Sequence, residues 1–275
     1  MSLSISSLNS GSNGNCYYIG NSSDAVLIDA GISCREVERR MSRSGLAMDR
    51  VKAIFISHEH HDHIRGVEVL SRKYRLPVYL TKPILENSRL NLDRTLARPY
   101  KAYVPVLVGG LSVLPFPKLH DASDPHSFTV ECGGIKIGVL TDIGSACQHV
   151  TDNFRQCHAA FLEANYDEEM LEKGAYPYPL KRRIRSDRGH LSNAQALELF
   201  ISKPEFMSHV FLSHLSRDNN SPELVLELFR KHAGNTRVAV ASRYEETGVY
   251  TIPENSEPDE VLKPFPVKNN QMTLF

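Results

Sequence analysis

The chain has 275 residues, with 32 basic and 32 acidic side chains, and 41% of its residues are hydrophobic. This length fits one large α/β domain or two small ones with a sizeable core, and no apolar run is long enough to span a membrane. The zero net charge gives no global attraction to a polyanion, so a nucleic-acid partner has to be argued from local clusters of charge.

Short apolar, β-branched runs predict strands, and capping patterns predict helices between them. The expected strands cover residues 16–19, 25–28, 51–56, 77–80, 104–108, 111–116, 128–132, 135–140, 238–241 and 249–252. The expected helices cover residues 33–44, 63–74, 83–91, 145–156, 196–201 and 222–232, with Ser192 and Gln195 as a capping box before the fifth. This order favours mixed sheets covered by helices.

The composition changes at Pro253, where a polar, acidic and proline-containing stretch begins. It predicts one domain over residues 1–252, followed by a linker and tail over residues 253–275. The five cysteines are scattered without a Cys-x-x-Cys pair, and residues 1–8 lack the features of a signal peptide. We therefore expect reduced thiols in a cytoplasmic protein.

Four potential metal ligands fall within six residues directly after the strand expected over 51–56. In an extended loop His58 and His60 point to one side, so both can bind one ion, whereas Asp62 and His63, where a helix begins, can reach a second. Imidazole and carboxylate together suit borderline divalent ions such as Zn, Mn, Fe or Ni. A lone histidine is more often structural, but this density of ligands predicts a metal site. Two intervening residues are expected to lie outside it: Glu59 and His61.

This spacing resembles the His-x-His-x-Asp-His signature of the metallo-β-lactamase superfamily, and the order of further motifs extends the resemblance over about residues 4–250. The resemblance implies an α/β fold, an αββα sandwich of two mixed β-sheets flanked by helices, that binds two divalent ions, with Zn or Mn favoured. It implies His58, His60 and His120 for one ion, Asp62, His63 and His214 for the other, and Asp142 as a bridge. Asp29, at the end of a strand, would orient the metal loop through hydrogen bonds. His126 is the alternative to His120.

Three features favour a phosphodiester substrate. His190, in the run Gly189-His190-Leu191-Ser192-Asn193 before a helix, resembles the additional histidine of nucleases in this superfamily, and a protonated imidazole can give a proton to a leaving oxygen. Residues 181–188 hold five positive charges against one negative, which predicts phosphate contacts by Arg182, Arg183 and Arg185, with Arg217 and Arg243 as weaker candidates. The loop 9–15 is rich in Gly, Ser and Asn, so Ser12, Asn13 and Asn15 are candidate substrate contacts. The expected catalytic residues are Asp62, as a ligand, and His190.

Together the runs 10–16, 120–122, 163–167 and 189–193 resemble the YycJ/WalJ branch of the superfamily, which implies a 5′-to-3′ exonuclease acting on DNA across an open face. Three alternatives stay open: an RNA endonuclease, a hydrolase of a thioester, lactone or β-lactam on the same fold, and a noncatalytic DNA-binding protein with structural metals. The tail, with Gln271, Met272, Leu274 and Phe275, resembles the peptide by which bacterial repair and replication proteins bind the DNA sliding clamp. Two large apolar groups at a chain end are seldom left without a partner.

Overall fold

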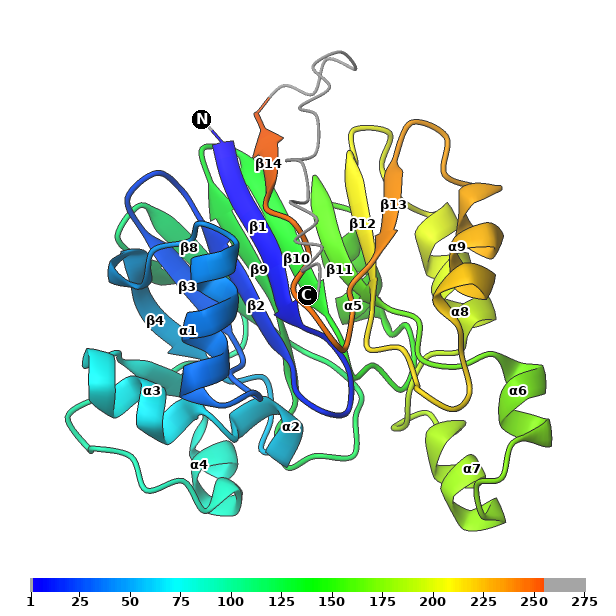
Figure 1. Cartoon of the computed structure of the whole chain (residues 1–275), viewed down its shortest axis with the longest axis horizontal. Coiled ribbons are helices and arrows are strands. Elements are labelled where there is room, and N and C mark those ends of the chain that lie inside the picture. The colour runs from blue at the N-terminus through cyan, green and yellow to red at the C-terminus, as the bar shows by residue number, and fades with distance from the viewer. Residues whose placement is uncertain (1, 255–275) are drawn as a thin grey trace, which may run out of the picture.

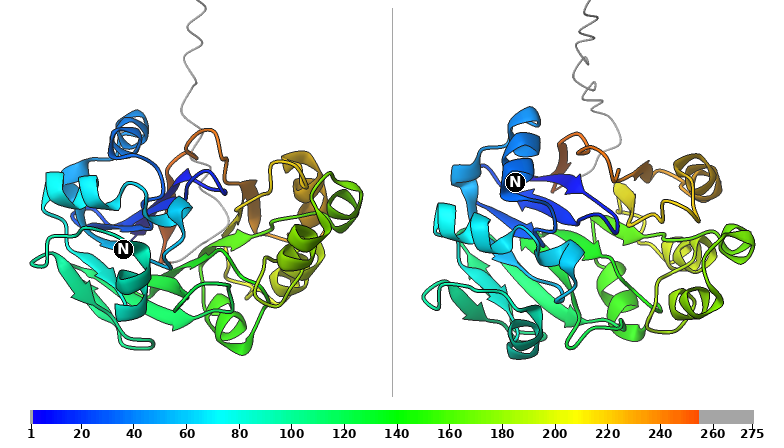
Figure 2. Two further views of the ribbon diagram at one scale, coloured as in Figure 1. Left: turned by 90° about the horizontal axis from the view of Figure 1, so that it is seen from below. Right: turned by 60° about the horizontal axis from the view of Figure 1, so that its bottom comes forward.

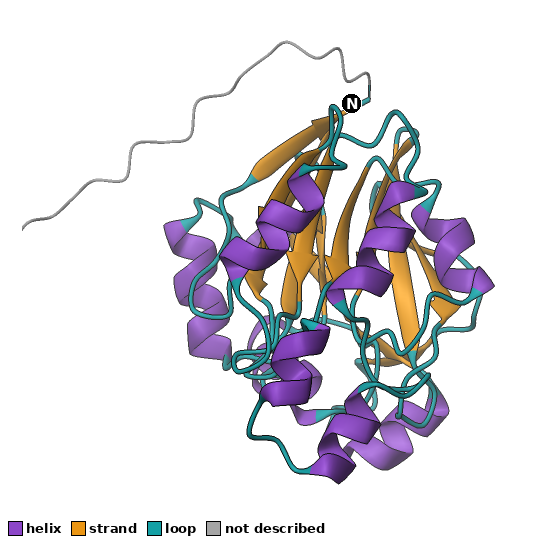
Figure 3. Ribbon diagram, turned by 90° about the vertical axis from the view of Figure 1, so that its right-hand side faces the viewer, coloured by secondary structure: helices purple, strands orange, loops and turns teal. Residues whose placement is uncertain are grey.

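The computed structural model describes residues 2–254, which form two seven-stranded sheets packed face to face between helices (Figure 1, Figure 3). The expected αββα sandwich is confirmed. The strands of the first sheet, in spatial order, are β14 (Tyr250–Pro253), β1 (Ser2–Asn9), β2 (Cys16–Gly20), β3 (Ala25–Ile28), β4 (Val51–Phe55), β5 (Val78–Leu80) and β6 (Ala97–Pro99). The strands of the second are β13 (Arg237–Val240), β12 (His209–Ser213), β11 (Ala159–Glu163), β10 (Ile135–Leu140), β9 (His126–Cys132), β8 (Leu111–Pro117) and β7 (Val106–Val108).

Several helices cover the outer faces of the two sheets, and others lie at their lower edge (Figure 1). The helices are α1 (Cys34–Arg43), α2 (His61–Ile64), α3 (Val67–Tyr74), α4 (Lys82–Ser88), α5 (Gln148–Phe154), α6 (Glu168–Lys173), α7 (Tyr178–Ile184), α8 (Asn193–Ile201) and α9 (Pro222–Arg230), with a 3₁₀ turn at Met48–Arg50. The predicted capping box at α8 is present: Ser192 accepts from the Gln195 N–H, and Gln195 accepts from the Ser192 N–H. The helix expected over 63–74 is divided into α2 and α3 around Gly66.

Two hydrophobic clusters hold the layers together. The larger lies between the sheets and reaches α1 and α3, and its buried residues include Leu27, Phe55, Phe128 and Phe161. The smaller packs α5, α8 and α9 against the outer face of the second sheet. No helix among residues 2–254 is long and apolar enough to cross a bilayer.

Strand direction brings the loops of both sheets to one edge. The pairs β3–β4, β10–β11 and β11–β12 are parallel, so the loops after these strands emerge together at the lower edge in Figure 1, as do α2 and α7. Three non-glycine residues there adopt the left-handed conformation that L-residues usually avoid: Asp29 with φ 59°, Asp142 with φ 55° and His214 with φ 56°. Strained backbone of this kind gathers at functional sites.

Candidate metal centre

Three histidines from the two sheets meet at this edge. His58 and His60 follow β4 in the first sheet, and His120 follows β8 in the second. The His58 Nε2 lies 3.1 Å from the His60 Nδ1, which lies 3.4 Å from the His120 Nε2. The structure thus brings together the three side chains expected to share one ion.

A second group of side chains adjoins the first. The Asp62 Oδ2 lies 3.6 Å from the His63 Nε2 and 3.7 Å from the His214 Nε2. Asp142 lies between the groups: its Oδ2 is 3.1 Å from the His63 Nε2, while its Oδ1 is 3.5 Å from the His214 Nε2 and 3.9 Å from the His120 Nε2. This is the central position that the resemblance implies for Asp142.

The donor atoms fit divalent ions. Bonds of about 2.0–2.1 Å at a tetrahedral zinc place two ligand nitrogens about 3.3 Å apart, close to the separations among His58, His60 and His120. Two buried atoms, the His214 Nε2 and the Asp142 Oδ2, make no hydrogen bond among the described residues, although the His63 Nε2 lies close to the latter. Buried polar atoms are rarely left without a partner, and a cation provides one.

The histidines are held in one orientation by hydrogen bonds on their other ring nitrogen, which is typical of metal ligands. The Nδ1 of His58 contacts the Ser57 hydroxyl at 2.9 Å, and that of His120 donates to the Gly189 carbonyl at 3.0 Å. The Nδ1 of His63 donates to the Asp29 Oδ2 at 2.7 Å. In each ring the Nε2 therefore faces the cluster.

Asp29 organises the loop that follows β4. It is fully buried, and in addition to His63 it accepts the Ser57 N–H at 2.8 Å on Oδ1 and the Ser57 hydroxyl at 2.8 Å on Oδ2. These contacts agree with the orienting role that the family resemblance implies for Asp29.

Glu163 and His190 form a pair beside the cluster. Glu163 ends β11 and is fully buried. Its Oε1 accepts from the His190 Nδ1 at 2.7 Å and from the His214 Nδ1 at 3.2 Å, and its Oε2 accepts the Ile143 N–H at 2.5 Å. The His190 ring lies 5.3 Å from the rings of both His120 and His214. Its Nε2 makes no hydrogen bond within residues 2–254, so this nitrogen is available to a bound molecule.

The charges of the cluster favour a cation. Burial opposes the charged form of His63, but Asp142, Asp29 and Asp62 outweigh burial and raise its pKa to about 10. Burial lowers the pKa of His58 well below its usual range, and it lowers that of His120 to about 3, so both rings are neutral and able to act as ligands. The surrounding carboxylates thus stabilise positive charge, and neutral imidazoles offer lone pairs to it.

Two residues beside the ligands had no role in our sequence-based prediction. Glu163 was part of a resembling run, but a single acidic residue at a strand end gives no spacing signal of its own. Lys118 is buried, and its Nζ donates to the Thr141 carbonyl at 2.7 Å. Burial lowers the pKa of its ammonium group, and Asp142 makes the largest contribution among the charges that oppose this change. A buried lysine two residues before His120 has no sequence pattern that would reveal it.

The surroundings of Asn15 do not match its expected role as a substrate contact. It is fully buried, and its amide nitrogen lies 3.0 Å from the His63 Nε2 and donates to the Asp62 Oδ2 at 3.3 Å. It therefore positions the metal loop, and contact with a substrate would require it to be exposed. Ser12 and Asn13 are exposed, but the N–H groups of Ser10, Gly11, Gly14 and Asn15 all donate within the protein, so most of this loop offers no free donors to a phosphate.

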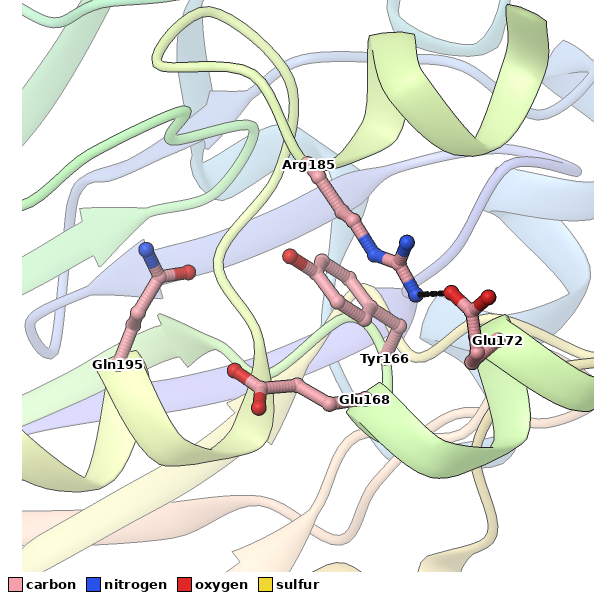
Figure 4. Close-up of a pocket in the computed structure, with 5 residues that line it drawn as sticks. All are labelled: Tyr166, Glu168, Glu172, Arg185 and Gln195. Carbon is pink, nitrogen blue, oxygen red and sulfur yellow. Dashed lines mark hydrogen bonds and ion pairs between the residues drawn. The ribbon is translucent and has the colours of Figure 1, made fainter. Parts of the chain in front are cut away.

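Arg182 and Arg183 lie on α7, which the sequence did not predict as a helix, and Arg185 is the residue that caps its C-terminal end. Arg182 and Arg183 are exposed, and the Arg183 Nε donates to the Asp121 carboxylate beside His120. Arg185 instead pairs with Glu172 in a pocket lined by Tyr166, Glu168 and Gln195 (Figure 4).

The structure places His126, the alternative to His120, outside the groups of ligands. His126 begins β9, contacts the Asp124 carbonyl and the Tyr100 ring, and belongs to neither ligand group, whereas His120 belongs to the first.

The predicted clamp-binding residues lie outside the described residues: Gln271, Met272, Leu274 and Phe275.

Comparison with known proteins agrees with this architecture. Residues 24–204 match the Beta-lactamase superfamily domain. The chain is 34% identical over 253 residues to "Exodeoxyribonuclease YycJ" of Bacillus anthracis, covering 90% of this chain and 91% of that protein. It is 33% identical over 223 residues to "Exodeoxyribonuclease WalJ" of Streptococcus pneumoniae, covering 79% and 83%.

Solved structures share the fold at low sequence identity. The metallo-β-lactamase fold protein YhfI from Bacillus subtilis has a TM-score of 0.71 at 13% identity, covering 91% of this chain and all of that one. Zinc-bound PqqB from Methylobacterium extorquens has a TM-score of 0.68 at 16% identity, covering 92% and 100%. The chain belongs to the beta-lactamase superfamily. With its groups of histidine and carboxylate side chains, it is a metal-dependent hydrolase of that superfamily.

Proposed function

We propose that this protein is a metal-dependent exodeoxyribonuclease that degrades DNA from 5′ to 3′. The observation that carries the proposal is the Glu163–His190 pair beside Asp142: a histidine held by a buried carboxylate, with its Nε2 free, at the edge of two groups of metal ligands. The choice of DNA is supported by the printed names of the two relatives, both exodeoxyribonucleases.

We assign His58, His60 and His120 to one divalent ion and Asp62, His63 and His214 to a second, with Asp142 between them. Divalent ions, when bound, supply Lewis acidity toward a phosphate oxygen and activate water at neutral pH. Zinc or manganese suits this mixture of imidazole and carboxylate, and iron or nickel is compatible with it.

His190 acts as the general acid in the proposed reaction. Water adds to phosphorus, the bond from phosphorus to the 3′ oxygen breaks, and that oxygen leaves with the proton held on the His190 Nε2. The proton lost by water is returned to the ring through solvent, so the cycle balances. Glu163 holds the ring through Nδ1 and stabilises its charged form, in the way that a carboxylate supports a catalytic histidine.

The finer parts of the proposal concern polarity and setting. We propose a free 5′ end as the starting point, a role in DNA repair and a cytoplasmic location on the basis of the resemblance to the YycJ/WalJ branch. Hydrolysis of a thioester or lactone would need neither His190 nor the arginines of α7, so the presence of both beside the ligands favours a phosphodiester.

The central test is digestion of end-labelled DNA duplexes, with and without a 5′ phosphate, in the presence of Mn²⁺ or Zn²⁺. Label released from the 5′ end as mononucleotides is expected. Asp62→Ala or His60→Ala should abolish hydrolysis and reduce bound metal without unfolding the chain, whereas His190→Ala should keep its metal and lose turnover by on the order of 10²-fold or more. Full activity of Asp62→Ala would refute the ligand assignment, and loss of metal from His190→Ala would refute the acid assignment.

Matched RNA and DNA duplexes in the same assay separate the proposed activity from RNA processing. Cleavage of the RNA alone would overturn the choice of DNA, and a thioester hydrolysed while DNA stays intact would overturn the nuclease proposal. DNA bound but never cleaved with any divalent ion would indicate a noncatalytic role.

We further propose that the tail binds the DNA sliding clamp through Gln271, Met272, Leu274 and Phe275, with the preceding acidic stretch as a tether that raises the local concentration of enzyme on DNA. The support is the sequence resemblance and the apolar pair at the chain end. In a clamp-binding titration, removal of residues 271–275 should abolish binding while clamp-independent cleavage persists. Equal affinity of the two proteins would contradict the proposal.

A further inference from the structure

Helix α7 presents an unpartnered tyrosine and two arginines on one surface. The Tyr178 side chain is 75% exposed, and Arg182 follows it by four residues, which places both on one face of the helix. An open hollow of about 370 Å³ lies along this surface, and it is lined by Tyr178, Pro179, Arg182, Arg183 and Ser186. Tyr178 belongs to none of the hydrophobic clusters, so its exposed ring has no structural role in holding α7 to the domain.

Two contacts attach this surface to the metal centre. The Arg183 Nε donates to the Asp121 carboxylate, and the Asp121 Oδ1 lies 3.4 Å from the His120 Nε2. The segment after α7 also packs against the loop that follows Asp142, where a Cβ on Gly144 would lie 2.2 Å from the Asp187 carbonyl oxygen. A polymer lying on α7 is therefore led directly to the ligands, and the view from below shows α7 at the same edge as α2 (Figure 2).

We propose that α7 is the docking surface for an unpaired segment of DNA, with Tyr178 stacked on a base and Arg182 and Arg183 pairing with the phosphates beside it. This inference rests on the proposed nuclease function. Charge complementarity selects the occupant, since exposed guanidinium groups attract a polyanion, and a flat ring beside them matches the face of a nucleobase. Phosphate contacts alone would not require an exposed aromatic ring, so Tyr178 is the observation that points to contact with a base.

A neighbouring pocket beside the C-terminal end of α7 is chemically unsuited to the backbone of DNA. Its lining includes Glu168 and Glu172, and the guanidinium of Arg185 is already paired with Glu172 (Figure 4). Two carboxylates against one paired arginine repel phosphates. Arg185 is thus enclosed by two carboxylates. Arg183 has one carboxylate partner, Asp121, with 53% of its side chain exposed, and Arg182 has no carboxylate partner among residues 2–254, so these two arginines can meet phosphates.

The geometry also restricts the form of the substrate. Bases inside a duplex are stacked on each other and shielded from a ring on the protein surface, whereas an unpaired or frayed end exposes their faces. We therefore expect the enzyme to act on DNA ends whose bases can separate, and Tyr178 to determine that preference.

The test compares two oligomers that differ only in their bases. Binding of the metal-loaded protein to a thymidine oligomer and to an abasic oligomer of equal length is measured by fluorescence anisotropy, with phosphorothioate linkages that resist cleavage. The wild type should prefer the thymidine oligomer by on the order of tenfold, the size typical of one stacked base. Tyr178→Ala should bind both oligomers equally, and Tyr178→Phe should retain the preference.

Two variants serve as controls. The first measures the contribution of charge to binding, and the second measures the effect of removing an aromatic ring elsewhere on the surface. Arg182→Gln should weaken the binding of both oligomers to the same extent and should reduce the salt dependence of binding. Phe206→Ala removes another exposed aromatic ring, 46% exposed and packed on His158 at the opposite edge of the sheet, and should leave the preference unchanged. A preference that persists in Tyr178→Ala, or a wild type without any preference, would overturn the proposal.

Failure of the nuclease function has a different signature. A wild-type protein that binds thymidine oligomers through Tyr178 but hydrolyses no nucleic acid would refute the proposed reaction and support the docking surface. Cleavage of DNA that is equally fast for the wild type and Tyr178→Ala on tailed and blunt ends would support the reaction and refute the docking surface.

Discussion

Glu163 links the acid–base side of the centre to the metal side. One of its oxygens accepts from both His190 and His214, and the other accepts the Ile143 N–H. Burial by itself raises the pKa of this carboxyl group, but His190 and His214 outweigh burial and keep the pKa below its usual value. In the proposed reaction Glu163 is therefore a positioning residue, since it would act through two histidines.

Glu163→Gln tests this role with almost no change in shape. The amide can still contact one histidine, but it cannot stabilise a charged His190 or accept from both rings. We expect turnover to fall by on the order of 10²-fold or more, and metal affinity to fall by about 10- to 100-fold, as for other residues that hold a ligand. Turnover and metal content are measured on the same sample. A variant that loses turnover through unfolding alone would show reduced helicity, and unchanged turnover would exclude the assigned role.

The residues of the centre differ in how clearly the sequence reveals them. His58, His60, Asp62 and His63 are close in the chain, so their spacing is itself a signal. Glu163 contacts partners 27 and 51 residues away, and only the parallel pairing of β10, β11 and β12 brings them together. The role of Asn15 was not predictable either, because its burial depends on how the loop 9–15 packs under Asp62.

At the level of secondary structure, most elements between β2 and α9 were predicted, and the differences have physical causes. Strand β11 is buried at every position, so it lacks the alternation of apolar and polar residues that identifies a half-exposed strand. Helix α7 begins with prolines, which resemble a loop in sequence but are well suited to the first turn of a helix. Strand β1 is rich in serine, and its Ser6 hydroxyl and Ser7 N–H bond to the distant residue Thr247.

Strand β12 carries a histidine whose protonation should make stability depend on pH. Burial, followed by the charge of Arg237, lowers the pKa of His209 from 6.5 to about 4. As the pH falls, His209 therefore takes up a proton near pH 6.5 in the unfolded chain but only near pH 4 in the folded chain. Between these values the unfolded state holds more protons, so the free energy of unfolding falls as the pH falls, by about 3 kcal/mol at most.

Denaturant unfolding of the wild type and His209→Gln at several pH values checks this prediction. The glutamine variant loses packing against Phe211 and Tyr250 at every pH, but its deficit relative to the wild type should shrink as the pH falls from 6.5 to 4. Protonation of the metal ligands affects both proteins alike and cancels in the comparison. A deficit that stays constant would show that His209 does not contribute to acid sensitivity.

Considered as a whole, the molecule assembles its centre from both sheets. His58, His60, Asp62 and His63 belong to the first sheet, whereas His120, Asp142 and His214 belong to the second. A bound ion would therefore join the two layers as well as support chemistry. Because the net charge of the chain is zero, the proposed affinity for DNA would come from local groups such as the arginines of α7.

Metal removal should consequently lower global stability. Ions bound only by the folded chain stabilise it by about 2.7 kcal/mol when their free concentration is 100 times the dissociation constant. We expect a chelator to lower the midpoint of thermal unfolding and added Zn²⁺ or Mn²⁺ to restore it, as followed by calorimetry. Asp142→Asn should show a smaller response to the chelator than the wild type. A midpoint that is indifferent to chelation would contradict a site shared by the two sheets.

The left-handed backbone at Asp29, Asp142 and His214 has an implication for attempts to improve this enzyme. Glycine adopts such angles at little steric cost, so in a screen for heat resistance run without metal ions, glycine at Asp142 or His214 would relieve this strain. With ions bound, the same replacement would remove a ligand, and the stabilisation by the ions would be lost with it. The metal content of the medium should therefore decide whether thermal selection discards the centre or keeps it, and directed evolution of this scaffold needs metal and a selection for turnover in the same round.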